Sequence, residues 1–343
     1  MIQTLPLVLF IVLTELTVGA FGLLYTLDVR NEVKRNFLVL YGIIYLFLAG
    51  LTLLFQQNFS TPELLATFPQ LDKAWIPYET APLVAFLLLL IPYNIFLWMD
   101  KKAGVEQAKG QPIEAGESNA EEQQGREQKS GSTLRTLRLL SGSAAVLAGI
   151  CTLAVMAMIY RPLGEAVFGG IFTVAEFFAA ALALGGVMTA MWLGHWYLVT
   201  PALTEKPLQF AVTVVLAAIL AQGIFTFAGG PLTPAASVSP PAATTVKAQS
   251  TATPAPVITS ATPTPGTQVK PTNVPVVTPI SVDAMGWLRI IVSFVMPLVL
   301  SALAWKLIRD RSFQSATGML YLVVVLALAG ECLARGLFLM GLS

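Results

Sequence analysis

The sequence predicts an all-α, polytopic membrane protein with eight transmembrane helices. Hydrophobic residues make up 55% of the 343-residue chain and charged residues only 11%, whereas soluble domains carry about 25% charged residues. The apolar residues gather in eight runs, each close to the roughly 20 residues that a helix needs to cross the hydrocarbon core. These runs cover residues 5–27, 37–56, 80–99, 139–160, 170–199, 208–229, 285–307 and 315–340.

Two long polar segments divide the chain into five parts. Residues 1–99 hold spans one to three, residues 139–229 hold spans four to six, and residues 283–343 hold the last two spans. The segment 100–138 is rich in Lys, Glu, Gln and Gly, with too little apolar surface to fold, which predicts a charged, disordered cytoplasmic loop. The segment 230–282 is rich in Pro and Thr, which predicts an extended, disordered external loop.

The placement of Lys and Arg predicts the orientation of the spans. The loops after spans one, three, five and seven carry most of the basic residues, whereas the opposite set holds only Lys73, Arg161, Lys247 and Lys270. Basic loops stay in the cytoplasm. We therefore expect a multi-pass membrane protein, surrounded by lipid, with both termini external.

Spans one and five share a pattern of a carboxylate followed by glycines. Glu15 precedes Gly19 and Gly22, and Glu176 precedes Gly185 and its neighbour. Because four is an even number of spans, a duplication would give two parallel four-helix bundles. The alternative is an unrelated pair of spans, since glycine is common in membrane helices.

Several charged side chains lie within the predicted spans, where charges normally face a bundle interior and mark functional sites. Glu331 and Arg335 stand four residues apart, on one face of the last helix, so we expect them to pair. Glu15 is either a proton relay, or partner of a bound polar group, or a buried residue that joins helices. Glu176 is expected to be solvated near the outer boundary, and Arg289 to reach the interface there.

His195 is the only histidine of the chain and lies at the cytoplasmic end of span five. It either donates to a quinone or takes up a proton, or it belongs to an interfacial belt with Trp192 and Trp196. A haem with two histidine ligands is excluded for this chain alone. Cys151 and Cys332 stand apart and outside any metal-binding motif, so we expect no metal site.

The last helix resembles that of the membrane anchor subunits of dimethyl-sulfoxide-reductase-type molybdoenzymes and of polysulfide reductases. Those subunits have about eight spans and close with a Gly-Glu-Leu-x-x-Arg-x-x-Phe-like segment. Here Gly330, Glu331, Arg335 and Phe338 match that pattern, and Cys332 replaces the leucine. The first span is similar more loosely, through Glu15 and the small residues after it.

This resemblance implies a membrane anchor that docks an iron–sulfur subunit of a molybdopterin-type complex and exchanges electrons with a quinone such as menaquinone, without a covalently bound cofactor. The sequence departs from the family after the second span. A His-Leu-Gly segment associated with quinol binding is replaced there by residues 54–58, Leu-Phe-Gln-Gln-Asn. The departure affects the expected quinone site more than the expected fold.

The leading hypothesis is therefore a non-catalytic anchor subunit of a respiratory complex in the bacterial inner membrane, with a quinone or proton-relay site formed by Glu15, His195, Glu331 and Arg335. Two alternatives stay open. One is a proton-coupled transporter of small solutes or ions, which the intramembrane carboxylates also favour. The other is a purely structural accessory subunit. No motif for phosphate, nucleic acid or independent catalysis is present.

Overall fold

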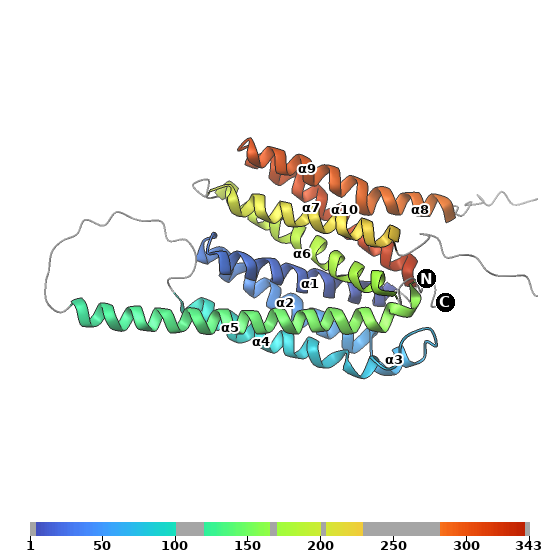
Figure 1. The fold of residues 1–343 in the computed structure, drawn as a ribbon, viewed down its shortest axis with the longest axis horizontal. Coiled ribbons are helices and arrows are strands. Elements are labelled where there is room, and N and C mark those ends of the chain that lie inside the picture. Colours follow the sequence, from blue (N-terminus) through green and yellow to red (C-terminus); the bar gives the residue numbers. More distant parts are fainter. Residues whose placement is uncertain (1–4, 101–119, 165–169, 200–203, 229–281, 340–343) are drawn as a thin grey trace, which may run out of the picture.

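The computed structural model describes residues 5–100, 120–164, 170–199, 204–228 and 282–339. In these ranges the chain forms helices and no strands (Figure 1). The elements are α1 (Leu5–Arg30), α2 (Arg35–Phe59), α3 (Pro62–Ala66), η1 (Ile76–Tyr78), α4 (Thr80–Met99), α5 (Ala120–Tyr160), η2 (Arg161–Leu163), α6 (Ile171–Val199), α7 (Lys206–Ala228), α8 (Val282–Ile290), the π-helical η4 (Ile291–Val295), α9 (Met296–Arg309) and α10 (Phe313–Leu339).

Eight helical segments are long and apolar enough to cross a membrane, so the predicted fold class is confirmed. They are α1, α2, η1 with α4, the part of α5 from Thr133 onward, α6, α7, the continuous α8–η4–α9 segment, and α10. The chain is thus an integral membrane protein with eight spanning helices. Their boundaries lie within a few residues of the predicted ones, except at the start of α5.

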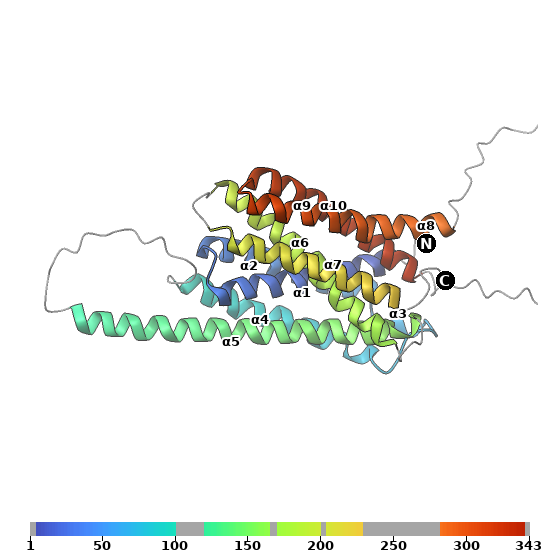
Figure 2. The same ribbon diagram turned by 45° about the horizontal axis from the view of Figure 1, so that its top comes forward.

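Helix α5 begins at Ala120 and projects beyond the rest of the bundle (Figure 2). Residues 120–138, which the sequence predicts to belong to a disordered loop, are therefore helical. Glu, Gln, Lys and Arg are good helix formers, and extending a helix already anchored in the membrane needs no new nucleation. Residues 101–119 of that loop, and nearly all of the Pro/Thr-rich segment 230–282, lie outside the described residues.

The helices form two units with the same order of neighbours. In the first unit α1 packs against α2 and α5, while α4 packs against both α2 and α5. In the second unit α6 packs against α7 and α10, while α9 packs against both α7 and α10. The contacts between the units repeat this correspondence, because α1 meets α10 and α6 meets α5. This is the arrangement expected of two parallel four-helix bundles.

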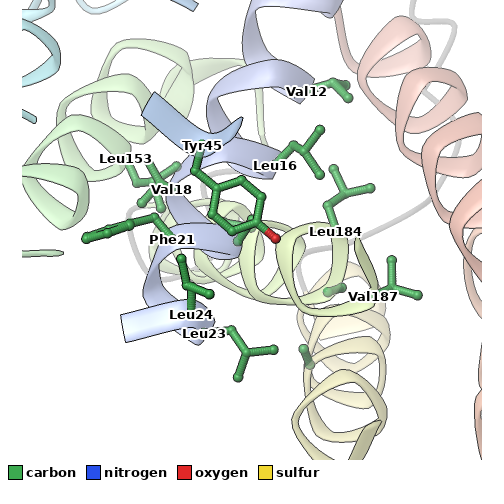
Figure 3. Packing of buried hydrophobic residues seen from close by; sticks show 14 of the residues in the cluster. Val12, Leu16, Val18, Phe21, Leu23, Leu24, Tyr45, Leu153, Leu184 and Val187 are labelled. Carbon is green, nitrogen blue, oxygen red and sulfur yellow. The ribbon is translucent and has the colours of Figure 1, made fainter. Parts of the chain in front are cut away.

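The two units join where α1 and α6 approach backbone to backbone. A Cβ atom added to Gly19 would collide with the carbonyl group of Ala181, and one added to Gly185 would collide with the backbone of Gly19 and Ala20. Around this contact the apolar side chains of α1 interlock with Leu184 and Val187 of α6 (Figure 3). Small residues permit such close approach in membrane helices.

The two ends of the bundle differ in charge. We call the end at which α1 begins and α10 ends the terminal end. The opposite end, which we call the basic end, carries Arg30, Lys34, Arg35, Lys306 and Arg309 at the helix termini and turns. Basic clusters of this kind mark the cytoplasmic side of membrane proteins.

Candidate functional site

The candidate site is a network of charged side chains buried between the two units. The guanidinium of Arg335 on α10 donates a 2.6 Å hydrogen bond to Oε1 of Glu15 on α1. Its Nε atom also lies 2.8 Å from Oε1 of Glu331, one turn earlier on α10. The side chains of Arg335 and Glu15 are 1% and 0% exposed. One cation is therefore shared by two carboxylates in an apolar interior.

Two neutral side chains complete the surroundings of this network. The side-chain amide of Gln222 on α7 donates a 2.6 Å hydrogen bond to the second carboxylate oxygen of Glu331. The ring of Phe177 on α6 lies under the guanidinium, with 3.9 Å between the ring centroid and Cζ of Arg335. That distance is well within the range of a cation–π interaction. Helices α1, α6, α7 and α10 all contribute to the site.

A second ion pair, between Glu176 and Arg289, lies beside the first. Glu176 directly precedes Phe177 on α6. Glu176 accepts a 3.3 Å hydrogen bond from the guanidinium of Arg289 on α8, and both side chains are nearly buried. The structure therefore corrects one expectation. Glu176 is not a freely solvated carboxylate, because it pairs with Arg289.

The position of Glu331 is set by a close contact between α10 and η4. The hydroxyl of Ser293 donates a 3.0 Å hydrogen bond to the carbonyl of Gly330, and a Cβ atom at Gly330 would lie 2.7 Å from Cα of Ser293. Ser293 belongs to a π-helical turn that ends just before Pro297. Such turns occur often at functional sites. Here the turn brings the backbone of the seventh span against the network.

His195 does not join the other three predicted site residues. It lies on α6, 18 residues beyond Phe177, which corresponds to about 27 Å along the helix at 1.5 Å per residue. Its exposed ring lies at the basic end, 3.4 Å from the hydroxyl of Tyr321. The structure thus brings together Glu15, Glu331 and Arg335 and places His195 near the opposite end of the bundle.

A separate buried ionic cluster closes the basic end of the first unit. Arg138 on α5 pairs with Asp28 on α1 at 3.2 Å and with Asp100, just after α4, at 2.8 Å. The hydroxyl of Tyr93 donates a 3.1 Å hydrogen bond to Asp28, and Arg35 donates to the carbonyl of Asp100. With Arg35 beside it, this cluster carries no excess of negative charge.

Sequence reasoning missed several of these residues. Gln222 could have been noticed as a polar residue within an otherwise apolar span. Asp28, Asp100 and Arg138 lie at predicted span boundaries, where charges are ordinary, so their burial left no sequence signal. Phe177 is one of many aromatic residues in the spans, and only its position identifies it.

The buried network can bind a proton. When all of its groups are ionised, it carries one excess negative charge. This charge results from three carboxylates and two guanidinium groups, those of Glu15, Glu176, Glu331, Arg289 and Arg335. Within the described part of the chain, no group donates a hydrogen bond to Oε2 of Glu15. That atom is a buried acceptor at the junction of the two units.

Scans of the chain against protein-family models, curated proteins and solved structures gave no match.

Proposed function

We propose that this chain is the membrane anchor subunit of a bacterial respiratory electron-transfer complex, and that its buried network exchanges protons with a quinone. The observation that carries the proposal is the sharing of Arg335 by Glu15 and Glu331, both nearly or fully buried at the junction of the two units. Charges at such depth are costly, and they are characteristic of proton relays and ligand sites. The resemblance of the last helix to known anchor subunits supports the same role.

The charge of the network supports proton exchange. An excess negative charge in an apolar interior is costly, and a proton bound to one of the carboxylates would offset it. Glu15 is the best placed to bind this proton, because its Oε2 atom has no partner, whereas the two oxygens of Glu331 face Arg335 and Gln222. The network would then alternate between a neutral and a singly negative state without moving a helix.

Quinone chemistry needs what this network offers. Reduction of a quinone to a quinol consumes two electrons and two protons, and the carbonyl oxygens of the quinone accept hydrogen bonds. Arg335 and Gln222 are donors, and Glu15 is the proton carrier. The electrons would come from a partner, which the resemblance implies to be an iron–sulfur subunit linked to a molybdopterin subunit.

The orientation supports a quinone site on the outer side. The positive-inside rule assigns the basic end to the cytoplasm. Arg335 lies four residues before the end of α10, near the terminal end, and its partner Glu15 lies only slightly nearer that end, 10 residues after Leu5 and 15 before Arg30 on α1. Protons released from the network would leave toward the outside. His195 would face the cytoplasm and would not be part of this quinone site.

Purification of the chain from its native membrane tests the proposed role. We expect it to bring along an iron–sulfur subunit, detectable by electron paramagnetic resonance, and to oxidise or reduce a quinone. A chain that purifies without any redox partner and without quinone-linked activity would contradict the proposal.

A transporter is the second candidate, because the network crosses the junction of two units with the same order of helices, and transporters built from repeats place their coupling sites at such a junction. Proton-driven uptake of a solute by the chain alone in proteoliposomes, abolished by Glu15→Gln, would favour this candidate. Full activity after replacement of all the buried charges would favour a purely structural subunit.

A further inference from the structure

A second group of buried polar atoms lies at the terminal end of the first unit, away from Arg335. Three helix termini meet there: the end of α2, with Gln56 in its last turn and Ser60 as its C-cap, the start of α4, with Glu79 as its N-cap, and the last residue of α5, Tyr160. Glu79 is 2% exposed, Gln56 1%, and Ser60 and Tyr160 0%. Residues 60–79, which include α3 and η1, form the adjacent connection (Figure 1).

The contacts in this group place oxygen atoms around one carboxylate. The hydroxyl of Ser60 donates a 3.0 Å hydrogen bond to Oε1 of Glu79. The amide nitrogen of Gln56 donates to the hydroxyl of Thr80 at 2.6 Å, which turns the amide oxygen the other way. Gln56 and Ser60 lie against the carboxylate of Glu79, and Tyr160 lies beside Ser60 and Glu79.

Three of these oxygens make no well-formed hydrogen bond in the described part of the chain, although Gln56 faces Glu79 and Ser60 faces Tyr160. They are Oε2 of Glu79, Oε1 of Gln56 and the hydroxyl of Tyr160, and each is fully shielded from solvent. Buried polar atoms without partners are rare and costly, and each calls for a bound species or another specific cause. A proton on Oε2 of Glu79 that is donated to Oε1 of Gln56 would satisfy two of these atoms and leave the hydroxyl of Tyr160, which lies beside Ser60. A cation can contact several oxygens at once.

The charges around Glu79 favour a bound cation. Among the described residues, no Lys or Arg forms an ion pair with Glu79, and the basic residue beside Tyr160, Arg161, pairs with Asp72 at 3.6 Å. Helices α2 and α5 both end at the site. Because helix C-termini carry partial negative charge, they add to the charge of the carboxylate, and only α4 presents a positive N-terminus.

We propose that Glu79, Gln56, Ser60 and Tyr160 bind a monovalent cation with the chemistry of Na⁺. Oxygen ligands suit hard cations, and divalent ions of this class are usually held by more than one carboxylate. A single carboxylate with neutral amide and hydroxyl oxygens balances one positive charge. The described residues contain no cluster of three or more acidic, histidine or cysteine ligands. The ion would tie together the ends of α2, α4 and α5.

Binding of radioactive Na⁺ to the purified full chain, together with thermal unfolding, tests this site. We expect one ion per chain and a saturable rise of the unfolding midpoint when NaCl replaces choline chloride at constant ionic strength, because a ligand of the folded state stabilises it. Glu79→Gln should weaken Na⁺ binding by about a hundredfold, since it removes the one charged ligand. Tyr160→Phe should weaken it less and keep the packing of the ring.

Glu63→Gln is the matched control, because Glu63 is an exposed carboxylate on α3 in the same connection. It should bind Na⁺ like the unaltered chain. An unfolding midpoint that is the same in NaCl and choline chloride would overturn the proposal, as would Na⁺ binding that persists in Glu79→Gln. If Glu79→Gln does not fold, unchanged Na⁺ affinity in Tyr160→Phe would overturn the assignment of Tyr160 as a ligand. Stabilisation by acid alone, without an effect of Na⁺, would identify a proton as the bound species and contradict the proposal.

Discussion

At the residue scale, Arg335 determines how the charges of the main network are tolerated. Its guanidinium pairs with Glu15 and Glu331, and it stacks on Phe177. Removing one partner of a buried pair typically costs about 3–5 kcal/mol, whereas replacing the whole set can be nearly neutral. The three charged residues should therefore respond differently to substitution, according to which charges remain unpaired.

Arg335→Leu should lower the thermal stability of the purified chain strongly, by about 3–5 kcal/mol, because two carboxylates are left without a cation. Glu331→Gln should cost much less, since Glu15 still pairs with the guanidinium. The double variant Glu331→Gln with Arg335→Met still leaves Glu15 without a cation, so full recovery of stability should require Glu15→Gln as well.

Arg311→Leu, which breaks an exposed pair with Glu205, is the control. It should lower stability by about 1 kcal/mol or less. Equal losses in Arg335→Leu and Arg311→Leu would show that the buried network does not stabilise the fold.

At the scale of helices, the close contact of α1 and α6 positions Glu15 against α10. Gly185 has no room for a side chain against the backbone of α1, whereas Gly22 has no atom within 4 Å of the position a Cβ would take. Gly185 therefore permits the contact between α1 and α6, whereas Gly22 can be replaced by a larger residue.

Gly185→Leu should separate α1 from α6 and destabilise the chain by several kcal/mol, since overpacking of this kind typically costs about 1–3 kcal/mol even where side chains can adjust. Gly22→Ala should leave stability unchanged or raise it by about 0.5–1 kcal/mol, as for other glycines within helices. Thermal unfolding in detergent compares the two. A Gly185→Leu variant as stable as Gly22→Ala would show that α1 and α6 do not need this contact.

Hydropathy predicted the existence and length of the helices, because the hydrocarbon core fixes how many apolar residues a span needs. The four-residue spacing of Glu331 and Arg335 on one helix predicted their pair, which the structure confirms. The partner of Arg335 on α1 is 320 residues away in sequence, and no local pattern specifies such a contact. The helical start of α5 was missed because a charged composition does not show whether a helix continues beyond the membrane.

At the scale of the whole molecule, the two buried ionic clusters have different charge balances. The cluster of Arg138 at the basic end lies within the first unit and balances its carboxylates with Arg138 and the neighbouring Arg35. The network of Arg335 joins the two units and has one carboxylate in excess. A balanced cluster suits a structural role, and an unbalanced one at the junction suits proton exchange. The central claim is that this excess carboxylate serves quinone chemistry.

Quinol oxidation by the purified complex carrying Glu15→Gln tests that claim most directly. The amide still accepts the hydrogen bond from Arg335, and Glu331 still balances the guanidinium, so the complex should assemble with normal yield. Turnover should fall by about a hundredfold or more, in line with the usual contribution of a positioned proton-transfer group, while Glu205→Gln at the exposed basic end keeps full activity. A Glu15→Gln complex that assembles and oxidises quinol at the unaltered rate would contradict the account.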